Sequence, residues 1–311
     1  MPKPAYAALP PSSSGLSLAS ASGSGFSLGQ PGPRHWSVFW REFGEGEALP
    51  ERCHVPGDGQ MTVDRHWAQF AERLPRGAQV LDIGCGAGTV GRTLLGRRPD
   101  LTVTGIDFAE VPVDEFPNLA IHPRVSMEAL PFGESCFDAA VSLFGIEYGV
   151  IADTALQLAR VLKPDGRFGF VVHHCESEIA HEGRTRVRGI QDVMTGRVRA
   201  AFLAGDTERF DQQRLRLQQD HPQEPTVKLV SDYFRRNIER PRAGRLEIWT
   251  KLANDVAVEV ALTSQMTRSA KSAAELGSWI APLLAVMTRV NLSVVRRGSG
   301  EPIGWAVGGV R

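Results

Sequence analysis

The chain has 311 residues, of which 42% are apolar and 23% charged, as in an ordinary globular protein rather than a disordered chain, a collagen-like fibre or a coiled-coil rod. Its 35 basic and 35 acidic side chains balance, so no overall field draws it onto nucleic acid or an anionic membrane. Four well-separated cysteines favour reduced thiols in a cytoplasmic protein, and no apolar run approaches the roughly 20 residues of a transmembrane helix.

Serine, glycine and proline make up more than half of residues 1–34, which contain no acidic residue. Such a segment buries too little apolar surface to offset its ordering entropy, so a disordered tail is predicted. A helix is predicted next, because four aromatic residues follow the i, i+3, i+4, i+7 spacing of one helical stripe. They are Trp36, Phe39, Trp40 and Phe43. The stripe either packs on the body of the protein or forms a lid whose rings touch a ligand.

Beyond residue 60 the sequence alternates between helical and strand patterns. Helices are predicted at 61–74, around 90–95 and at about 152–162. Strands are predicted at 79–83, 101–106, 124–127, 137–143 and 168–172, with a turn at 164–166. This alternation is typical of an α/β fold whose parallel sheet is covered by helices on both faces. Several helices follow over 176–290, and 292–295 and 303–307 are predicted to form a closing β-hairpin.

The most informative segment is 80–88, Val-Leu-Asp-Ile-Gly-Cys-Gly-Ala-Gly, in which three alternate glycines follow a strand and precede a helix. Glycine permits a sharp turn and the close approach of a ligand, which then meets the free N–H groups of the helix start. Two classes of cofactor bind to such loops. Residues 86–91 also satisfy GxGxxG, the dinucleotide fingerprint, and Asp107 follows at the spacing of a ribose-binding carboxylate in either class.

Three features argue against a dinucleotide. Asp82 lies inside the apolar strand, where a pyrophosphate would repel its carboxylate and a cationic amino-acid group would attract it. Counted from Gly84 at the strand end, the fingerprint fails, because Thr89 stands at the last glycine position. A closing antiparallel hairpin is also foreign to dinucleotide domains.

Four sequence blocks, in order, resemble the class I S-adenosylmethionine-dependent methyltransferases, in particular the type 11 group that includes ubiquinone-biosynthesis methyltransferases. They are VLDIGCGAG at 80–88, VTGIDF at 103–108, MEALPFGESCFDAAVS at 127–142 and VLKPDGRFGFVV at 161–172. The resemblance runs from about Trp67 to His174, together with the terminal hairpin. It implies a Rossmann-like, doubly wound, mostly parallel seven-stranded sheet with an antiparallel C-terminal hairpin, a helical insert after the fifth strand, and S-adenosyl-L-methionine as cofactor.

The resemblance also implies a role in cofactor binding for ten residues. These are Asp82, Gly84, Cys85, Gly86, Gly88, Asp107, Phe108, Met127, Glu128 and Phe144. The loop from Gly84 to Gly88 would pass beneath the methionine part and the ribose. Asp82 would help to position the amino group, and Asp107 would accept hydrogen bonds from the two ribose hydroxyls.

On the adenine side, Phe108 would lie beside the ring, with Met127 and Glu128 at its edge. Phe144 would end a strand next to the methyl donor. The chain departs from many relatives at Ser126, where they carry an aspartate that bonds the adenine amino group. A hydroxyl still accepts that bond without charge, so we expect cofactor binding to survive, weakened by roughly 1 kcal/mol.

Ligands of such sheets lie beyond the carboxyl ends of the strands, so Glu147, Tyr148 and His174 are candidates on the acceptor side. Glu147 or His174 would be a general base if the acceptor must lose a proton, and otherwise a wall of the pocket. Alignment of donor and acceptor alone can supply about 7–11 kcal/mol. No metal is predicted, because His173 and His174 are neighbours on a strand and point to opposite faces.

Four segments are predicted: a disordered tail at 1–34, a cofactor-binding core at 35–175, a helical insert at 176–290 and a closing hairpin at 291–311. The insert would cover the acceptor as a lid and exclude water with its aromatic rings; a layer packed only for stability is the alternative. The rings belong to Phe202, Phe210, Tyr233, Phe234 and Trp249. Its surplus of arginine is interpreted as solvated helix faces, because the bases form no cluster with interleaved aromatics.

The predicted function is methyl transfer from S-adenosylmethionine to a small-molecule acceptor. The alternatives are a non-catalytic S-adenosylmethionine-binding module, an RNA methyltransferase favoured only by the arginine-rich insert, and an NAD(P)-dependent oxidoreductase. Neither a nucleic-acid partner nor a membrane span is expected. The sequence leaves the acceptor atom and the oligomeric state open.

Overall fold

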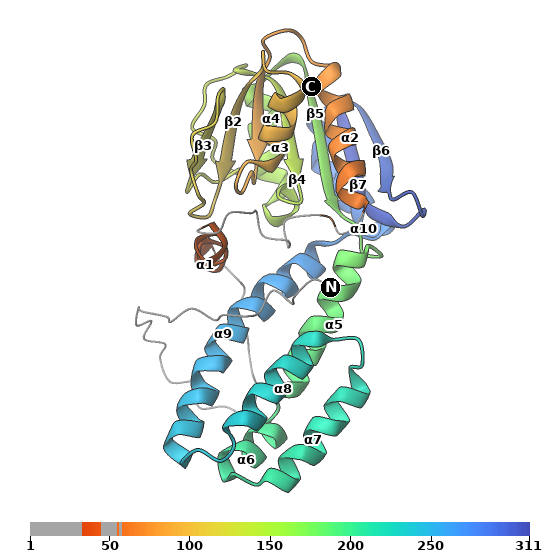
Figure 1. The fold of residues 1–311 in the computed structure, drawn as a ribbon. Helices are drawn as coiled ribbons and strands as arrows, with labels where there is room; N and C mark the ends of the chain where they lie inside the picture. Colours follow the sequence, from red (N-terminus) through yellow and green to blue (C-terminus); the bar gives the residue numbers. More distant parts are fainter. Residues whose placement is uncertain (1–32, 45–54, 56–57) are drawn as a thin grey trace.

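The computed structural model describes residues 33–44, 55 and 58–311, which form an α/β body and a helical lobe projecting from one edge of it (Figure 1). The predicted tail lies almost wholly outside these residues, as do Cys53 and the side chain of Phe43. Within the described ranges, no helix is long and apolar enough to cross a membrane.

The body is built on one seven-stranded sheet in the order β3-β2-β1-β4-β5-β7-β6. Its strands are β1 (Gln79–Ile83), β2 (Thr102–Asp107), β3 (Leu119–Pro123), β4 (Phe137–Leu143), β5 (Leu162–His173), β6 (Thr288–Arg296) and β7 (Pro302–Val310). The first five run parallel, and β7 lies antiparallel between β5 and β6. The predicted fold, a mostly parallel sheet closed by an antiparallel C-terminal hairpin, is confirmed.

Helices cover both faces of the sheet because its central strands are apolar on both sides. In β1, Val80 and Leu81 are fully buried in two different cores. The helices on the Val80 side are α2 (Gly59–Glu72) and α3 (Thr89–Arg97), and those on the Leu81 side are α4 (Ile151–Val161), α10 (Ala273–Trp279) and α11 (Ala281–Val286). The helices predicted at 61–74, around 90–95 and at 152–162 correspond to α2, α3 and α4.

The third strand is not at 124–127, as predicted, but at Leu119–Pro123. Ile121 is buried there between two exposed neighbours, which is the pattern of an edge strand with one covered face. Arg124 then adopts a φ of +62°, a left-handed conformation that ends the strand.

The turn predicted at 164–166 lies within β5, where it interrupts the pairing of β5 with β4. The partners of β4 jump from Leu162 to Arg167, and Asp165 between them has a φ of +60°. The part of β5 that runs on to His173 is therefore the regular strand that the sequence indicated.

The helical lobe is shorter than the predicted 176–290 insert. The chain leaves the body at His173–Cys175 and returns at Lys271: Lys271 N donates to His173 O over 2.8 Å, and Cys175 N donates to Lys271 O over 3.0 Å. Beyond this point, α10 and α11 bury Leu276 and Leu283 in the core beside the sheet. These two helices therefore belong to the body, because their apolar faces pack on it.

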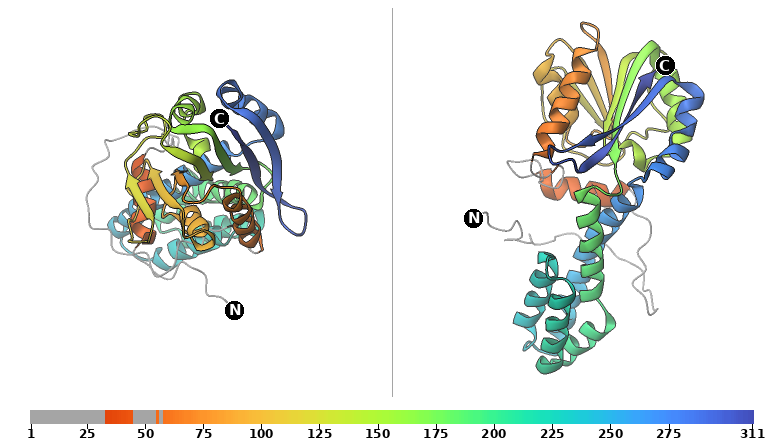
Figure 2. Two further views of the ribbon diagram at one scale, coloured as in Figure 1. Left: turned by 90° about the horizontal axis from the view of Figure 1, so that it is seen from above. Right: turned by 90° about the vertical axis from the view of Figure 1, so that its right-hand side faces the viewer.

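Five helices remain in the lobe: α5 (Glu178–Val193), α6 (Gly196–Ala204), α7 (Thr207–Asp220), α8 (Pro225–Asn237) and α9 (Arg242–Ser269). Helices α5 and α9 leave the body side by side, and α6 to α8 complete the lobe at its far end (Figures 1 and 2). The views show this end well separated from the sheet.

The aromatic residues of the lobe form a core of their own. Phe202, Phe210, Phe234 and Trp249 are buried in it, and Tyr233 packs against it. Helices α5 and α9 carry these rings away from the sheet, where they bury apolar surface against one another. This packing favours the alternative, a layer packed for stability, while the lid over the acceptor stays a prediction.

Candidate cofactor and acceptor site

The predicted cofactor loop lies at the carboxyl edge of the sheet, between β1 and α3. Gly84 has a φ of +63°, and a Cβ on it would lie 2.9 Å from Cα of Gly145, which follows β4. A Cβ on Gly145 would in turn lie 2.9 Å from Gly84 O. Two glycines are thus needed for the ends of β1 and β4 to approach so closely.

Asp107 at the end of β2 holds the loop from the neighbouring strand. Its Oδ2 accepts from Gly86 N over 2.9 Å, and its Oδ1 accepts from Ala109 N over 2.8 Å. Burial raises the pKa of Asp107, although these backbone hydrogen bonds act in the opposite direction. The structure therefore brings two of the predicted blocks together, and each carboxylate oxygen keeps a lone pair for a further donor.

Asp82 is almost completely buried within β1. Its Oδ2 accepts from Gly91 N over 3.3 Å, whereas Oδ1 has no hydrogen-bond partner among the described residues. Burial raises the pKa of Asp82 to about 7; the Gly91 bond opposes the shift and the charge of Asp107 adds to it. A buried carboxyl oxygen without a partner is costly, so this atom fits a cationic or hydrogen-bond-donating group.

Cys85, between the first two loop glycines, is buried against Ile121 and Ala109. Burial, followed by the charges of Asp82 and Asp107, raises the pKa of its thiol well above the ordinary value. The thiol therefore stays protonated and is unsuited to act as a nucleophile.

Glu128 ties the predicted adenine side to the start of α4. Its Oε1 accepts from Val150 N over 2.8 Å, and Ser126 donates its hydroxyl proton to Oε2. Burial acts to raise the pKa of Glu128, but these hydrogen bonds outweigh it and the pKa is lowered. Because Ser126 Oγ also accepts from Glu128 N over 3.2 Å, it offers a ligand only its remaining oxygen lone pair. Met127 is buried beside this pair, and Phe108 is 54% exposed, so its ring is accessible to a flat ligand.

A buried carboxylate–imidazole pair lies at the carboxyl ends of β4 and β5. Glu147, on the short helix η2 (Ile146–Tyr148), places Oε1 2.7 Å from His173 Nδ1 and accepts from His173 N over 3.0 Å. Its Oε2 has no partner in the described part of the chain. Phe144, with a φ of +53°, stacks on the His173 ring at a centroid distance of 4.1 Å. The pair is therefore held rigidly from two sides.

The other two acceptor-side candidates are placed differently. The ring of Tyr148 lies 6.2 Å from that of His173, so it belongs to the same cluster. His174 instead stacks on Trp305 at 4.6 Å, and its Nδ1 accepts from Glu176 N over 3.0 Å. The side chains of the two histidines lie on opposite faces of the sheet, as expected of neighbours on a strand. No group of three side chains suited to a metal ion occurs among the residues that the structure describes.

Helix α1 (Pro33–Gly44) lies across this edge of the sheet (Figure 1). A Cβ on Gly86, whose φ is +52°, would lie 2.4 Å from Cζ2 of Trp40. Trp36 lies 5.3 Å from Tyr148 and donates to Gln265 Oε1 of α9 over 2.9 Å. The aromatic stripe therefore packs on the body, as one reading expected, and the surface that it covers is the predicted cofactor loop.

A family model for a methyltransferase domain matches residues 80–166, the segment that runs from the glycine loop through Asp107 and Glu147 to the start of β5. This segment is similar to a methyltransferase domain. The match leaves α1, the lobe and the closing hairpin outside it. It supports the predicted methyltransferase family.

The ubiquinone/menaquinone biosynthesis C-methyltransferase of Citrifermentans bemidjiense is 31% identical over 120 residues, which are 34% of this chain and 51% of that protein. Ribosomal RNA small subunit methyltransferase G of Salinispora tropica is 46% identical over 55 residues, 17% of this chain and 23% of that protein. The solved geranyl diphosphate C-methyltransferase of Streptomyces coelicolor is 19% identical with a TM-score of 0.32, covering 36% of this chain and 47% of that one. The chain spans about half the length of the curated methyltransferases of quinone biosynthesis that it matches.

The sequence predicted a glycine loop between β1 and α3, and the structure has it there, but two of its neighbours were not predicted. Nothing in the sequence indicated that Trp40 lies over Gly86, because this contact joins two segments that are far apart in the chain. The pairing of Glu147 with His173 rather than His174 depends on the register in which Leu143 of β4 lies opposite Val171 of β5. His173 is the histidine whose ring stacks on Phe144. Choosing the histidine on the same face of the sheet as Phe144 would have predicted the pair with Glu147.

Proposed function

We propose that the protein transfers a methyl group from S-adenosylmethionine to a small-molecule acceptor. The observation that carries this proposal is the hydrogen bond of 2.9 Å from Gly86 N to Asp107 Oδ2. It joins the glycine loop after β1 to the carboxylate at the end of β2, the two features that the family uses for the methionine, ribose and adenine parts of its cofactor. When bound, S-adenosylmethionine supplies an electrophilic methyl group on a sulfonium.

Several groups of the chain fit that cofactor. Asp107 has lone pairs for the ribose hydroxyls, and the unpartnered Oδ1 of buried Asp82 suits the amino group. Gly84, Cys85, Gly86 and Gly88 would form the floor of the site, with Phe108, Met127, Glu128 and Phe144 around it. Trp40 occupies the near side of Gly86, so α1 has to shift for a ligand to lie against the loop.

On the acceptor side, we assign the proton-accepting role to His173. With Nδ1 directed at Glu147, the Nε2 atom of His173 is left to take a proton from an acceptor hydroxyl, amine or carbon acid. The Glu147 carboxylate then stabilises the charged imidazole, and it fixes the ring orientation before the reaction. Tyr148 contributes a wall beside this pair. Holding the acceptor in line with the methyl group supplies the rest of the rate enhancement.

The acceptor class follows from the surroundings. Phe144, Tyr148 and Trp36 lie about the buried pair, which favours an aromatic or lipid-like metabolite of the kind methylated by the type 11 group. The partial likeness to a ribosomal RNA methyltransferase keeps RNA as the second candidate acceptor. The cytoplasm remains the expected location because the cysteines are dispersed, and we expect no stable nucleic-acid partner.

The first experiment measures equilibrium binding of S-adenosylhomocysteine and of NAD(P) to the full chain. The proposal expects binding of the first and none of the second; the reverse would make the protein an oxidoreductase. Transfer of a labelled methyl group into fractionated cell extract then identifies the acceptor. Binding without label in any small-molecule or RNA fraction would make it a non-catalytic binding module.

Variants of the histidines test the assignment of the base. His173→Ala should lower kcat by about 100-fold to 10,000-fold, the range for a lost general base, with unchanged affinity for S-adenosylhomocysteine. His174→Ala is the matched control, because it is an equally buried neighbour that stacks on Trp305 away from Glu147. Equal losses in the two variants, or no loss in the first, would contradict the assignment.

A further inference from the structure

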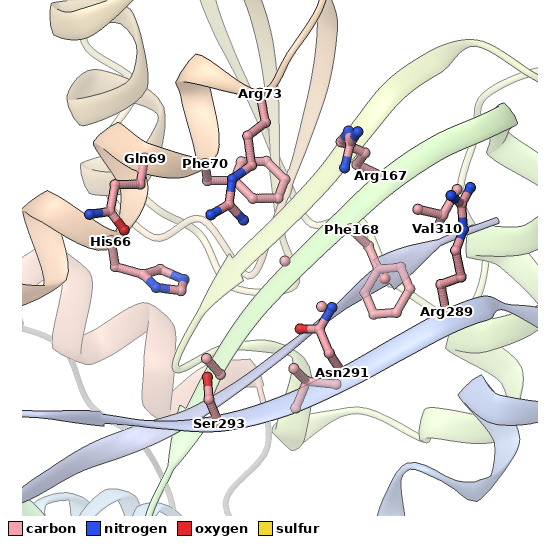
Figure 3. A pocket seen from close by; sticks show the side chains of 15 residues that line it. His66, Gln69, Phe70, Arg73, Arg167, Phe168, Arg289, Asn291, Ser293 and Val310 are labelled. Carbon is pink, nitrogen blue, oxygen red and sulfur yellow. The ribbon is translucent and has the colours of Figure 1, made fainter.

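A second cleft lies on the body, between α2 and the part of the sheet formed by β5, β6 and β7 (Figure 3). Its volume is about 440 Å³. Arg167 marks its position on β5, six residues before His173 at the carboxyl end of the same strand. The cleft is therefore remote from the glycine loop, and the proposed methyl transfer does not use it.

The hollow exists because the sheet carries small residues at this point. Gly169 of β5 pairs with Gly308 of β7, which in turn pairs with Asn291 of β6. The ring of Phe70 from α2 lies over Gly169, where a Cβ would be 2.7 Å from Cε2. No side chain rises from Gly308, so the space beside Phe70 stays open. The cleft thus has an aromatic wall and a flat backbone floor.

The polar lining of this cleft is basic. Arg73 at the end of α2, Arg167 of β5 and Arg289 of β6 come from three different elements, and no acidic residue lines the cleft. Arg289 has one distant ionic contact, 3.6 Å from an exposed Asp165. Arg73 and Arg167 form no ion pair with any described residue.

Neutral donors complete the lining: His66 and Gln69 of α2, and Asn291 and Ser293 of β6. Figure 3 shows the α2 side chains facing those of β6 across the hollow. Burial, and then the charge of Arg73, lower the pKa of His66. Its imidazole is accordingly neutral at pH 7, and it adds hydrogen bonding without adding charge.

We infer that this cleft binds a small phosphorylated molecule. The planar guanidinium group can donate two parallel hydrogen bonds to a pair of phosphate oxygens. Three arginines around one hollow therefore suit a ligand that presents several such pairs of oxygens. A volume of about 440 Å³ lies within the range of small-molecule sites. The arginines surround one hollow instead of following a line, which favours a compact ligand over an extended nucleic acid or peptide. The open face of Phe70 suits a flat group attached to the phosphate.

The test is calorimetric titration of the full chain with inorganic pyrophosphate and with a nucleoside triphosphate, at about 0.15 M salt so that unspecific attraction is screened. Both probes should bind. Arg73→Ala and Arg289→Ala should each weaken binding by about tenfold or more, the effect of one lost charge-assisted hydrogen bond. Arg197→Ala, which removes an exposed arginine from α6 in the lobe, is the matched control and should change nothing.

A further variant fills the hollow without altering charge. A Cβ on Gly308 would have ordinary contacts, 3.4 Å to Asn291 Oδ1 and to Phe168 O, so Gly308→Leu should fold and should abolish binding of both probes. Affinity for S-adenosylhomocysteine should be unchanged in all four variants, which separates this site from the cofactor loop.

Three results would overturn the inference. The first is that neither probe binds with a Kd below about 1 mM. The second is that the cleft variants bind as the unmodified chain does, or lose no more than Arg197→Ala. The third is that RNA or an acidic peptide binds with the expected dependence on these arginines while neither small probe binds, which would make the cleft a macromolecular docking surface.

Discussion

The carboxyl edge of the sheet and the helical lobe bury their side chains in opposite ways. At the edge, Asp82 and Glu147 are buried, and each keeps a carboxyl oxygen without a described partner. In the lobe, the buried rings of Phe234 and Trp249 stack at 4.9 Å, and carboxylates have partners: Asp211 pairs with Arg235, and the buried Glu224 accepts from Thr226 N. Buried carboxyl oxygens without a partner reduce stability and are typical of functional sites, which favours ligand chemistry at the edge. The lobe also holds an unpartnered buried atom, Arg245 Nε, but the same guanidinium group donates to three backbone carbonyls.

The largest effect is expected from Gly86→Val, which should abolish binding of S-adenosylhomocysteine. The branched side chain would fill the space against the loop, and a left-handed φ of +52° costs a non-glycine residue about 1–2 kcal/mol. Calorimetry measures binding, and thermal unfolding checks the fold. Gly96→Val in α3 is the control, because a Cβ there meets nothing within 4 Å; retained binding in Gly86→Val would remove the loop from the cofactor site.

The lobe should respond to Phe234→Ala in stability and not in ligand binding. Removing this fully buried ring should lower the free energy of unfolding by about 3–5 kcal/mol, with cofactor affinity unchanged. Leu229→Ala on the same helix is the control. Because Leu229 is 38% exposed, this variant should lower the free energy of unfolding much less. A fall in turnover of the identified acceptor without a fall in stability would support the lid interpretation of the lobe.

Asp107→Ala should weaken binding of S-adenosylhomocysteine by about 1.5–3 kcal/mol, roughly tenfold to more than a hundredfold. The variant removes the acceptor for the ribose hydroxyls and also the acceptor for Gly86 N and Ala109 N. The Asp107→Asn variant keeps one side-chain oxygen and should lose less affinity for S-adenosylhomocysteine. Equal affinity in the unmodified chain and in Asp107→Ala would show that the ribose is held elsewhere.

Cofactor affinity should rise with pH between about pH 6 and 8. Burial raises the pKa of free Asp82 to about 7, and a cationic amino group beside Oδ1 favours the ionised carboxylate, so binding releases a proton below that pKa. The affinity should change by up to about tenfold per pH unit on the acidic side. Titrations of the Asp82→Asn variant should lose this slope; an unchanged slope would assign the proton to another group.

The same carboxyl group affects folding with the opposite sign. Because its pKa is raised in the folded chain, the folded state holds the proton more tightly than the unfolded state does. Its contribution to the free energy of unfolding therefore becomes more favourable as the pH falls from about 7 towards the ordinary aspartate pKa. Comparison of Asp82→Asn with the unmodified chain over this range isolates that contribution.

The smallest effect is expected from deletion of residues 1–30. The segment has too little apolar content to join a core, so the melting temperature and cofactor affinity should stay nearly unchanged. It lies outside the described residues. A loss of several degrees would show that Leu16, Leu18 or Phe26 packs on the body.

Most of the body could be read from local pattern. Strands β1, β2, β4 and β5 follow apolar runs bounded by turn residues, and the glycine spacing marks the loop that Asp107 then holds. The failure at β3 has a simple cause: an edge strand with one covered face carries little apolar signal, and Val125 and Met127 in the following segment imitate a strand while packing against the core from a loop.

The sequence by itself determined the α/β class, the closing hairpin and the position of the glycine loop, because each depends on residues that are neighbours in the chain. Only the tertiary structure decided that Trp40 covers Gly86, that Glu147 pairs with His173, and that the aromatic rings of the insert pack far from the sheet. These relations join segments that are distant in sequence. Helical periodicity shows that a face is apolar, but strand register and helix packing determine which surface buries it.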